Sequence, residues 1–87
     1  LFFNLGEQES IVSYGLLQQL REKGIAAELY HEPAKMDKQF KYAEKKKIRY
    51  VVIIGSNELA QGTATIKNLE SGKQETVPRE GFIGFFG

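Results

Sequence analysis

The sequence predicts an α/β fold: a three-layer domain in which helices flank a mixed sheet of about five strands. Apolar runs of strand length alternate with amphipathic segments of helical period, which is the pattern of β-α-β units. Residues 50–54 are apolar without interruption, as is typical of a strand covered on both faces. Two further strand-like segments surround a glycine-containing turn at residues 70–73, which predicts a hairpin. With 87 residues, of which 41% are hydrophobic and 26% charged, we expect residues 1–87 to form a single domain.

The first half of the chain predicts a strand, a helix and a second strand. Residues 1–4 indicate the end of a buried strand, and because the chain does not begin with Met we expect a piece of a longer protein. A helix is predicted over residues 7–23, with two glutamates in its first turn and a glycine just after its end. Its inner stripe consists of Val12, Leu16, Leu17 and Leu20. Residues 25–30 predict the second strand, and a proline-containing loop follows at residues 31–34.

The second half predicts a helix, a buried strand, a hairpin and a last helix. The helix runs from Met36 to Lys47, and the apolar strand at residues 50–54 follows it. Residues 63–69 and 74–77 are the strands of the hairpin. Residues 79–86 predict a final apolar helix, which either packs on the sheet or presents a surface that meets the rest of a longer protein.

The order of these elements predicts the topology. Two consecutive β-α-β units imply parallel strands joined by right-handed crossovers, so the expected strand order is 2-1-3. The hairpin then extends one edge in antiparallel fashion. Because the third strand lies inside this sheet, Val51, Val52, Ile53 and Ile54 should all be buried.

Positive charge is concentrated in one segment, Lys35 to Arg49. This segment has seven basic and two acidic residues and a net charge of +5, whereas residues 1–34 sum to −3 and residues 50–87 to −1. On a helix, one face would carry Lys38, Lys41, Tyr42 and Lys45, and the opposite face Met36, Phe40 and Ala43. A basic face with an aromatic ring suits a polyanion such as a nucleic acid. It is also typical of solvated helix surface, and lysines in the last turn complement the carbonyl end of the helix dipole.

Catalytic, metal and cofactor sites are not predicted within this chain. His31 is the only histidine and there is no cysteine, which excludes His-pair and thiolate metal sites and thiol chemistry. The serines lack the Gly-x-Ser-x-Gly elbow, and Gly6 alone does not make a phosphate-binding loop. No apolar run approaches the length that crosses a bilayer, so no membrane partner is expected. The lack of cysteine suits a reducing cytoplasm.

Four motifs in order resemble a known family. They are Leu20-Arg21-x-x-Gly24-Ile25, Lys38-Gln39-Phe40-Lys41-Tyr42-Ala43, Val52-Ile53-Ile54-Gly55-x-x-Glu58-Leu59 and Lys67-Asn68-Leu69-x-x-Gly72-x-Gln74-Glu75. Together they resemble the C-terminal anticodon-binding domain of class IIa aminoacyl-tRNA synthetases over essentially the whole chain. The second motif favours the histidyl branch. The resemblance implies an anticodon-binding-domain-like fold that holds the anticodon loop of a tRNA while a separate catalytic domain performs the ligation.

The resemblance also implies particular RNA-binding residues. Glu58 matches an anticodon-reading glutamate of the threonyl relatives, and a carboxylate suits base N–H groups better than phosphates. The alternative for Glu58 is a structural cap on the turn at residues 56–59. Lys67 matches an arginine of a relative; because lysine lacks the bidentate fork, a phosphate contact is expected there.

Five further residues complete the predicted anticodon site. Lys35 and Lys41 match basic anticodon contacts on the second helix, and Asn4 matches a polar contact at the end of the first strand. Lys38 lies on the same basic helix face. Tyr42 either stacks on a base or packs between the helix and the sheet edge. The ends of strands one and three and the start of the second helix should converge at the carboxyl edge of the parallel strands.

The expected partners are the tRNA anticodon loop and the catalytic domain of a longer parent chain, and the parent is expected to be a cytoplasmic homodimer that uses ATP and Mg²⁺. DNA is not an expected partner, and the chain by itself should be non-catalytic. Two other functions remain open: a regulatory or interaction domain of a synthetase paralogue without aminoacylation activity, and a flavodoxin-like small-ligand binder.

Overall fold

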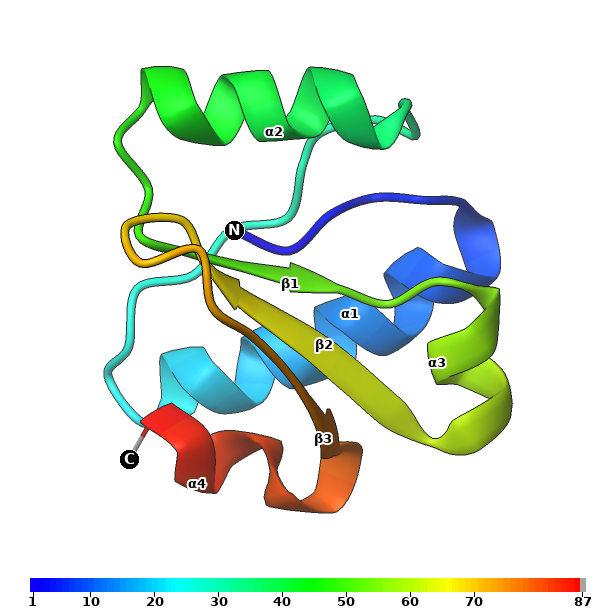
Figure 1. Cartoon of the computed structure of the whole chain (residues 1–87). Coiled ribbons are helices and arrows are strands. Elements are labelled where there is room, and N and C mark those ends of the chain that lie inside the picture. The colour runs from blue at the N-terminus through cyan, green and yellow to red at the C-terminus, as the bar shows by residue number, and fades with distance from the viewer. Residues whose placement is uncertain (87) are drawn as a thin grey trace.

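The computed structural model describes residues 1–86. Its elements in chain order, shown in Figure 1, are α1 (Glu7–Glu22), α2 (Met36–Lys45), β1 (Tyr50–Ile53), α3 (Ser56–Gln61), β2 (Thr63–Asn68), β3 (Gln74–Pro78), the 3₁₀ turn η1 (Arg79–Gly81) and α4 (Phe82–Phe86). No helix among residues 1–86 has the length and apolarity needed to cross a membrane.

The sheet has three antiparallel strands in the order β1-β2-β3. Val52 of β1 lies opposite Ile66 of β2, and Ile66 lies opposite Glu75 of β3. The turn between β2 and β3 is held by the Asn68 side chain, whose Oδ1 accepts hydrogen bonds from the backbone N–H groups of Glu70 and Ser71 at 2.9 and 3.1 Å. The predicted hairpin is therefore confirmed.

The prediction of a five-stranded mixed sheet is wrong, because the two N-terminal segments form no strands. Each contributes an isolated parallel bridge instead: Phe2 pairs with Leu29 on one side and with Val52 on the other. The predicted neighbours 2-1-3 are thus present, but they pair at single positions. After Phe2 the first segment leads into α1, which begins at Glu7, so it does not run alongside either neighbour for a second bridge.

The segment around Phe2 pairs with the side of β1 that β2 leaves free. The Phe3 N–H donates to the Val52 carbonyl at 2.9 Å, and the Val52 N–H donates to the Leu1 carbonyl at 2.8 Å. Although β1 is an outer strand of the three-stranded sheet, its backbone is therefore paired on both sides. Burial of the apolar run is confirmed, since Val51 to Ile54 are at most 8% exposed.

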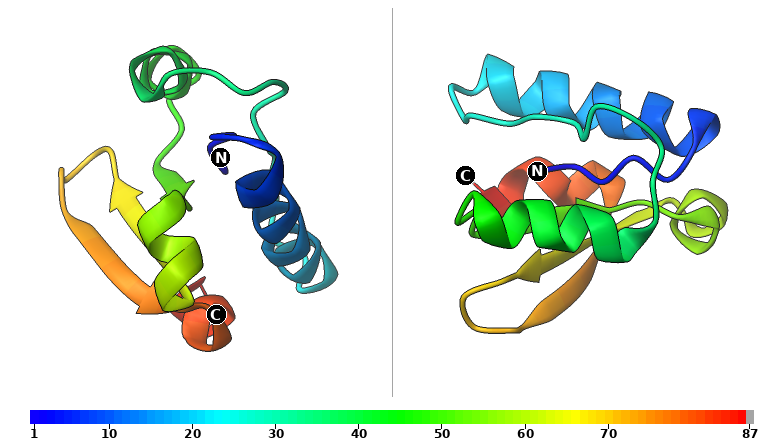
Figure 2. Two further views of the ribbon diagram at one scale, coloured as in Figure 1. Left: turned by 90° about the vertical axis from the view of Figure 1, so that its right-hand side faces the viewer. Right: turned by 90° about the horizontal axis from the view of Figure 1, so that it is seen from above.

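The sheet separates two hydrophobic cores, as Figures 1 and 2 show, with α2 on one side and α1 and α4 on the other. Alternation along each strand produces them, because successive side chains point to opposite faces. The first core joins Val52, Ile54 and Ile66 to the inner stripe of α1 and to Phe82. The second core joins Val51 and Ile53 to Phe3 and Ala43.

The inner face of α2 differs from the one predicted. Ala43 is buried as expected, but Met36 is 39% exposed and Phe40 only partly buried, while Gln39 is completely buried. The face is therefore rotated toward Gln39 and Ala43, which are one helical turn apart. The helix also ends at Lys45 rather than Lys47, because the backbone of Lys47 has a positive φ of 56° that leaves helical geometry.

The last helix packs on the sheet, which is one of the two predicted interpretations. Phe82 is fully buried, and its ring centroid lies 5.7 Å from that of Phe2 and 5.3 Å from that of Phe86. Phe85, which is also in α4, remains 38% exposed.

Candidate nucleic-acid interface

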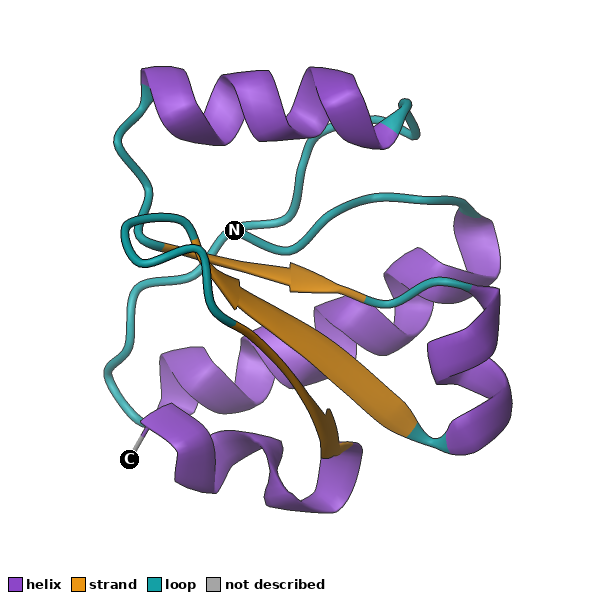
Figure 3. Ribbon diagram, in the orientation of Figure 1, coloured by secondary structure: helices purple, strands orange, loops and turns teal. Residues whose placement is uncertain are grey.

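A groove of about 440 Å³ lies on the α2 side of the sheet, between α2 and α3. Its floor comes from the strands, where Thr65 and Lys67 of β2 share a face with Ile53, while α2 contributes one wall and the first turn of α3 another. Figure 3 shows the strands lying between α2 and the pair α1 and α4. The residues that line the groove are Leu5, Met36, Phe40, Ile53, Gly55, Ser56, Asn57, Glu58, Thr65, Lys67 and Gln74.

The groove confirms the predicted convergence of segments. Leu5 follows the first bridging segment, Gly55 follows β1, and Met36 begins α2, and all three line it. Of the predicted site residues, Glu58 and Lys67 lie in this groove.

Glu58 caps the turn that begins α3. Its Oε1 accepts a hydrogen bond from the Gly55 backbone N–H at 2.8 Å, and its Oε2 accepts one from the Thr65 hydroxyl at 3.1 Å. The Thr65 hydroxyl lies 3.2 Å from that of Thr76 on β3. The carboxylate is thus held by two elements, which fixes its position at the groove. Each oxygen has a second acceptor site, so capping leaves the group able to accept further hydrogen bonds.

Lys67 lies against α2. Its Nζ is 5.1 Å from the ring centroid of Phe40, a distance at which a cation is attracted to an aromatic face. The contact holds the ammonium group at the groove while it remains partly exposed. No carboxylate pairs with Lys67 among the ion pairs of residues 1–86.

A buried amide joins α2 to the first segment. The Gln39 Oε1 accepts from the Asn4 backbone N–H at 2.7 Å, and its Nε2 donates to the carbonyls of Asn4 and Ala34, both at 2.8 Å. Gln39 therefore acts as a strand neighbour would, since it satisfies both backbone groups of Asn4. This places the start of α2, and with it Met36 and Phe40, at the groove.

Asn4 does not line the groove. Its side chain is 8% exposed, and its Nδ2 donates to the Tyr30 carbonyl at 3.2 Å. Its Oδ1 is buried without a hydrogen-bond partner. In this structure Asn4 joins the first segment to residue 30.

Lys38 and Tyr42 face away from the groove, toward the segment at residues 28–32. The Lys38 Nζ lies 3.3 Å from Glu32 Oε1 in an exposed ion pair. Tyr42 packs edge-on against Tyr30 with ring centroids 5.3 Å apart, and its hydroxyl donates to Glu28 Oε1 at 3.5 Å. The packing interpretation of Tyr42 thus describes its position.

Lys35 and Lys41 are exposed. Lys35 occupies the N-cap position of α2, next to Met36 in the groove wall. Lys41 follows Phe40, the other α2 residue in that wall.

The family comparison agrees with this geometry. Residues 4–87 match the model of the anticodon binding domain family. The chain belongs to this family.

Relatives and solved structures place this anticodon-binding domain among synthetases. It is 48% identical over 84 residues to the histidine–tRNA ligase of Bacteroides fragilis and 43% identical over 84 residues to that of Christiangramia forsetii, and each alignment covers 97% of this chain and 18% of the ligase. It is similar to the crystal structure of histidyl-tRNA synthetase from Nostoc, with a TM-score of 0.90, 30% identity and coverage of 98% of this chain and 20% of that one. The chain spans about a fifth of the length of these relatives.

The fold extends to a more distant synthetase. The RNA binding domain of threonyl-tRNA synthetase from Cryptosporidium parvum has a TM-score of 0.86 at 17% identity, covering 98% of this chain and 22% of that one. At this identity the likeness shows the fold alone.

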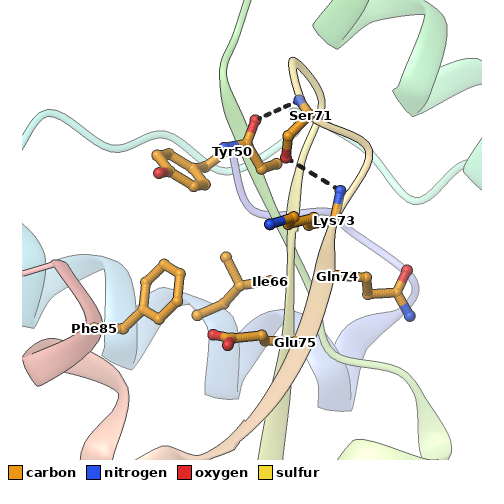
Figure 4. A pocket seen from close by; sticks show the side chains of 8 residues that line it. Tyr50, Ile66, Ser71, Lys73, Gln74, Glu75 and Phe85 are labelled. Carbon is orange, nitrogen blue, oxygen red and sulfur yellow. Dashed lines mark hydrogen bonds between the residues drawn. The ribbon is translucent and has the colours of Figure 1, made fainter.

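The anticodon-binding domain has a second hollow, of about 450 Å³, on the opposite face of the sheet. Figure 4 shows Tyr50 and Phe85 on one side of it, Ile66 at its floor and Lys73 and Glu75 from the hairpin on the other side. None of the predicted site residues lines it.

The domain shows no metal centre within residues 1–86, because no three His, Cys, Asp or Glu side chains lie close enough to share an ion. His31 is exposed and lies 3.5 Å from Glu32, and its ring packs on Tyr30 at 4.6 Å between centroids.

Three groove residues escaped the sequence analysis. Gln74, Asn57 and Ser56 offer amide and hydroxyl groups at the groove, and polar residues in turns and outer strands give no signal that separates them from solvated surface. Gln39 had a signal, since it precedes Ala43 by one helical turn and a polar residue on a buried stripe requires partners.

Proposed function

We propose that this anticodon-binding domain is the tRNA anticodon-loop binding module of a histidyl-tRNA synthetase, which ligates histidine to tRNA(His). The observation that carries the proposal is the groove between α2 and α3. Glu58 and Lys67 both line this groove, beside the basic helix. The 48% identity to a histidine–tRNA ligase supports the histidyl branch. ATP and Mg²⁺ belong to the separate catalytic domain, and the parent protein is a cytoplasmic homodimer.

The chemistry of the groove suits single-stranded RNA. Unstacked bases expose N–H groups, and the free acceptor sites of Glu58 can take them, because its position is fixed by Gly55 and Thr65. Lys67 supplies a positive charge for the adjacent phosphate, and Phe40 beneath it keeps that charge in place. A carboxylate next to a polyanion costs electrostatic free energy, and this cost favours bases that donate to it and disfavours those that do not.

The basic helix supplies the sequence-independent part of the affinity. Lys35 and Lys41 contact phosphates at the groove, and Lys38 adds to the positive field after it leaves its exposed pair with Glu32. Tyr42 offers its partly exposed edge to the RNA while it packs on Tyr30. Asn4 contributes by placing α2 through Gln39 rather than by a direct contact.

The two other functions receive no support from a specific observation. A regulatory domain of a paralogue would have the same fold. The Glu9 carboxylate disfavours a flavodoxin-like phosphate site behind Gly6. A Cβ placed on Gly6 would lie 2.8 Å from Glu9 Oε1, so a negative charge already lies at the start of α1, where the phosphate would bind.

Nuclear magnetic resonance mapping tests the proposal. An anticodon stem-loop RNA of tRNA(His), added to the ¹⁵N-labelled chain, should shift the amide signals of Asn57, Glu58 and Lys67. The amides of Lys73 and Glu75, at the second hollow, should stay in place. Shifts confined to the second hollow would contradict the proposal.

A further inference from the structure

Helix α1 presents a neutral, partly apolar surface to solvent. Of the large hydrophobic side chains in residues 1–86, four are exposed, and the two most exposed, Ile11 at 67% and Tyr14 at 50%, are neighbours on α1. They lie three residues apart, which puts them on one face of the helix. That face points away from the core, since Leu16, Leu17 and Leu20 fill the opposite side.

No charge interrupts this surface. Residues 10–20 contain no Asp, Glu, Lys or Arg, although Tyr14, Gly15 and Gln18 are exposed. On α2, by contrast, most exposed positions carry charge. Depletion of charge and the presence of tyrosine are typical of the centre of a protein–protein interface. The Gln18 Nε2 donates to the Tyr14 hydroxyl at 2.8 Å, which holds the ring in place.

Gly15 provides a second observation. It lies in the middle of α1, where glycine destabilises a helix by about 0.5–1 kcal/mol relative to alanine. A Cβ at this position would meet no atom within 4 Å, so the domain itself gives no steric reason for glycine. A surface that packs closely on Ile11 and Tyr14 would give that reason.

We propose that the face of α1 formed by Ile11, Tyr14, Gly15 and Gln18 is the surface on which the catalytic portion of the parent synthetase docks. The inference rests on the proposed function, because it requires a longer synthetase chain. The relatives contain about four-fifths of their length outside the region matched here. Helix α1 covers the sheet face opposite α2, so docking there leaves the RNA groove open.

RNA fits this face less well. It offers no basic residue between Glu7 and Arg21, so phosphates find no counter-charge. The first turn of the helix carries Glu7 and Glu9, which further disfavour a polyanion.

Cysteine labelling in the full-length synthetase tests the docking. Ile11→Cys and Tyr14→Cys are labelled with a maleimide in the native protein and in urea, and mass spectrometry of the peptide gives each rate. We expect both positions to react at least about ten times more slowly in the native protein than in urea. The control Lys45→Cys, exposed on α2, should show less than about a threefold difference. Equal protection at all three positions would overturn the proposal.

A second pair of measurements identifies the occupant. Adding Gly15→Arg to Ile11→Cys should restore rapid labelling, since the long arginine side chain prevents the catalytic portion from packing closely on this face of α1. A photo-crosslinking amino acid at position 11 should form links to the catalytic portion. Links to α1 of another copy, or protection that appears only when tRNA is added, would refute the assignment. Because labelling requires no RNA, the result is independent of whether the groove binds an anticodon.

Discussion

Glu58 caps the start of α3, and we propose that the same carboxylate reads the anticodon. Glu58→Gln keeps an acceptor for the Gly55 N–H, and the new amide can donate to the Thr65 hydroxyl, which then donates to Thr76. The variant should therefore fold normally. If Glu58 reads the anticodon, discrimination between cognate and altered anticodons should fall by about 1–3 kcal/mol, the scale of base-edge contacts. Fluorescence titration of both RNAs measures it.

A matched control for Glu58 is Glu75→Gln, which makes the same change on the opposite sheet face. It should leave discrimination unchanged. If Glu58→Gln keeps full discrimination and lowers only the melting temperature, Glu58 is a cap and nothing more.

Gln39 is the buried polar residue on which the position of α2 depends. Gln39→Met keeps the size of the side chain but leaves the N–H of Asn4 and the carbonyl of Ala34 without partners, while the Asn4 carbonyl keeps only its bond from the Ala34 N–H. Each unpaired buried group costs about 1–3 kcal/mol, so the free energy of unfolding should fall by about 2 kcal/mol or more. Urea denaturation measures this loss. Gln18→Met, an exposed counterpart on α1, should change the stability by less than about 0.5 kcal/mol, and similar losses for both variants would contradict the role of Gln39.

The sequence could predict which residues are chemically suited to the site but not which of them meet. Glu58 and Lys67 line the same groove because Glu58, in the first turn of α3, is bonded to Thr65 of β2, the strand that also carries Lys67. Lys38 and Tyr42 turn away because α2 is rotated about its axis. That rotation depends on Gln39 finding partners in two distant segments, and no local periodicity contains this information.

At the scale of elements, the proposed function assigns the phosphate contacts to α2. Each phosphate neutralised on single-stranded RNA contributes about −0.7 to the slope of log affinity against log salt concentration. Lys41→Ala should therefore flatten the slope by about 0.7 and weaken binding to cognate and altered RNA alike. Titrations at several salt concentrations provide the slope. Lys73→Ala, at the second hollow, is the charge-matched control and should leave the slope unchanged; a Lys41→Ala slope equal to that of the wild type would remove α2 from the interface.

Helix α4 is short, yet it closes the core beneath the sheet. Phe82→Ala should lower the free energy of unfolding by about 3–5 kcal/mol, since the ring is fully buried against Phe2. Phe85→Ala should cost less than half as much, because that ring is partly exposed and packs only at the surface on Tyr50 and Phe86. Thermal or urea unfolding compares the two, and equal losses would show that α4 does not dock through Phe82.

Elements were easier to predict than their pairing. The bounds of α1, β1 and the hairpin follow from apolar period, glycine and turn residues, which are local signals. The five-stranded sheet failed because strand formation by residues 1–4 and 25–30 depends on how many consecutive pairs their geometry allows. Only the bridges of Phe2 with Leu29 and Val52 form.

At the scale of the whole molecule, the sheet divides the surface by chemistry. One side carries the groove and the basic helix α2, and the other carries the neutral face of α1. The net charge of +1 does not reveal this division, because the charge of +5 on residues 35–49 is offset by net negative charge in the rest of the chain. The groove proposed to bind RNA and the α1 face proposed to dock the catalytic portion thus lie on opposite sides of the sheet, so one does not block the other.

The most direct test of the account is the affinity of the chain for tRNA(His) compared with the same tRNA carrying a changed anticodon, measured at one salt concentration. The groove account predicts tighter binding to the cognate tRNA by about tenfold or more, equivalent to about 1.4 kcal/mol or more. Both tRNAs have the same phosphate backbone, so charge alone cannot produce the difference. Equal affinities for the two would contradict recognition of the anticodon by the groove.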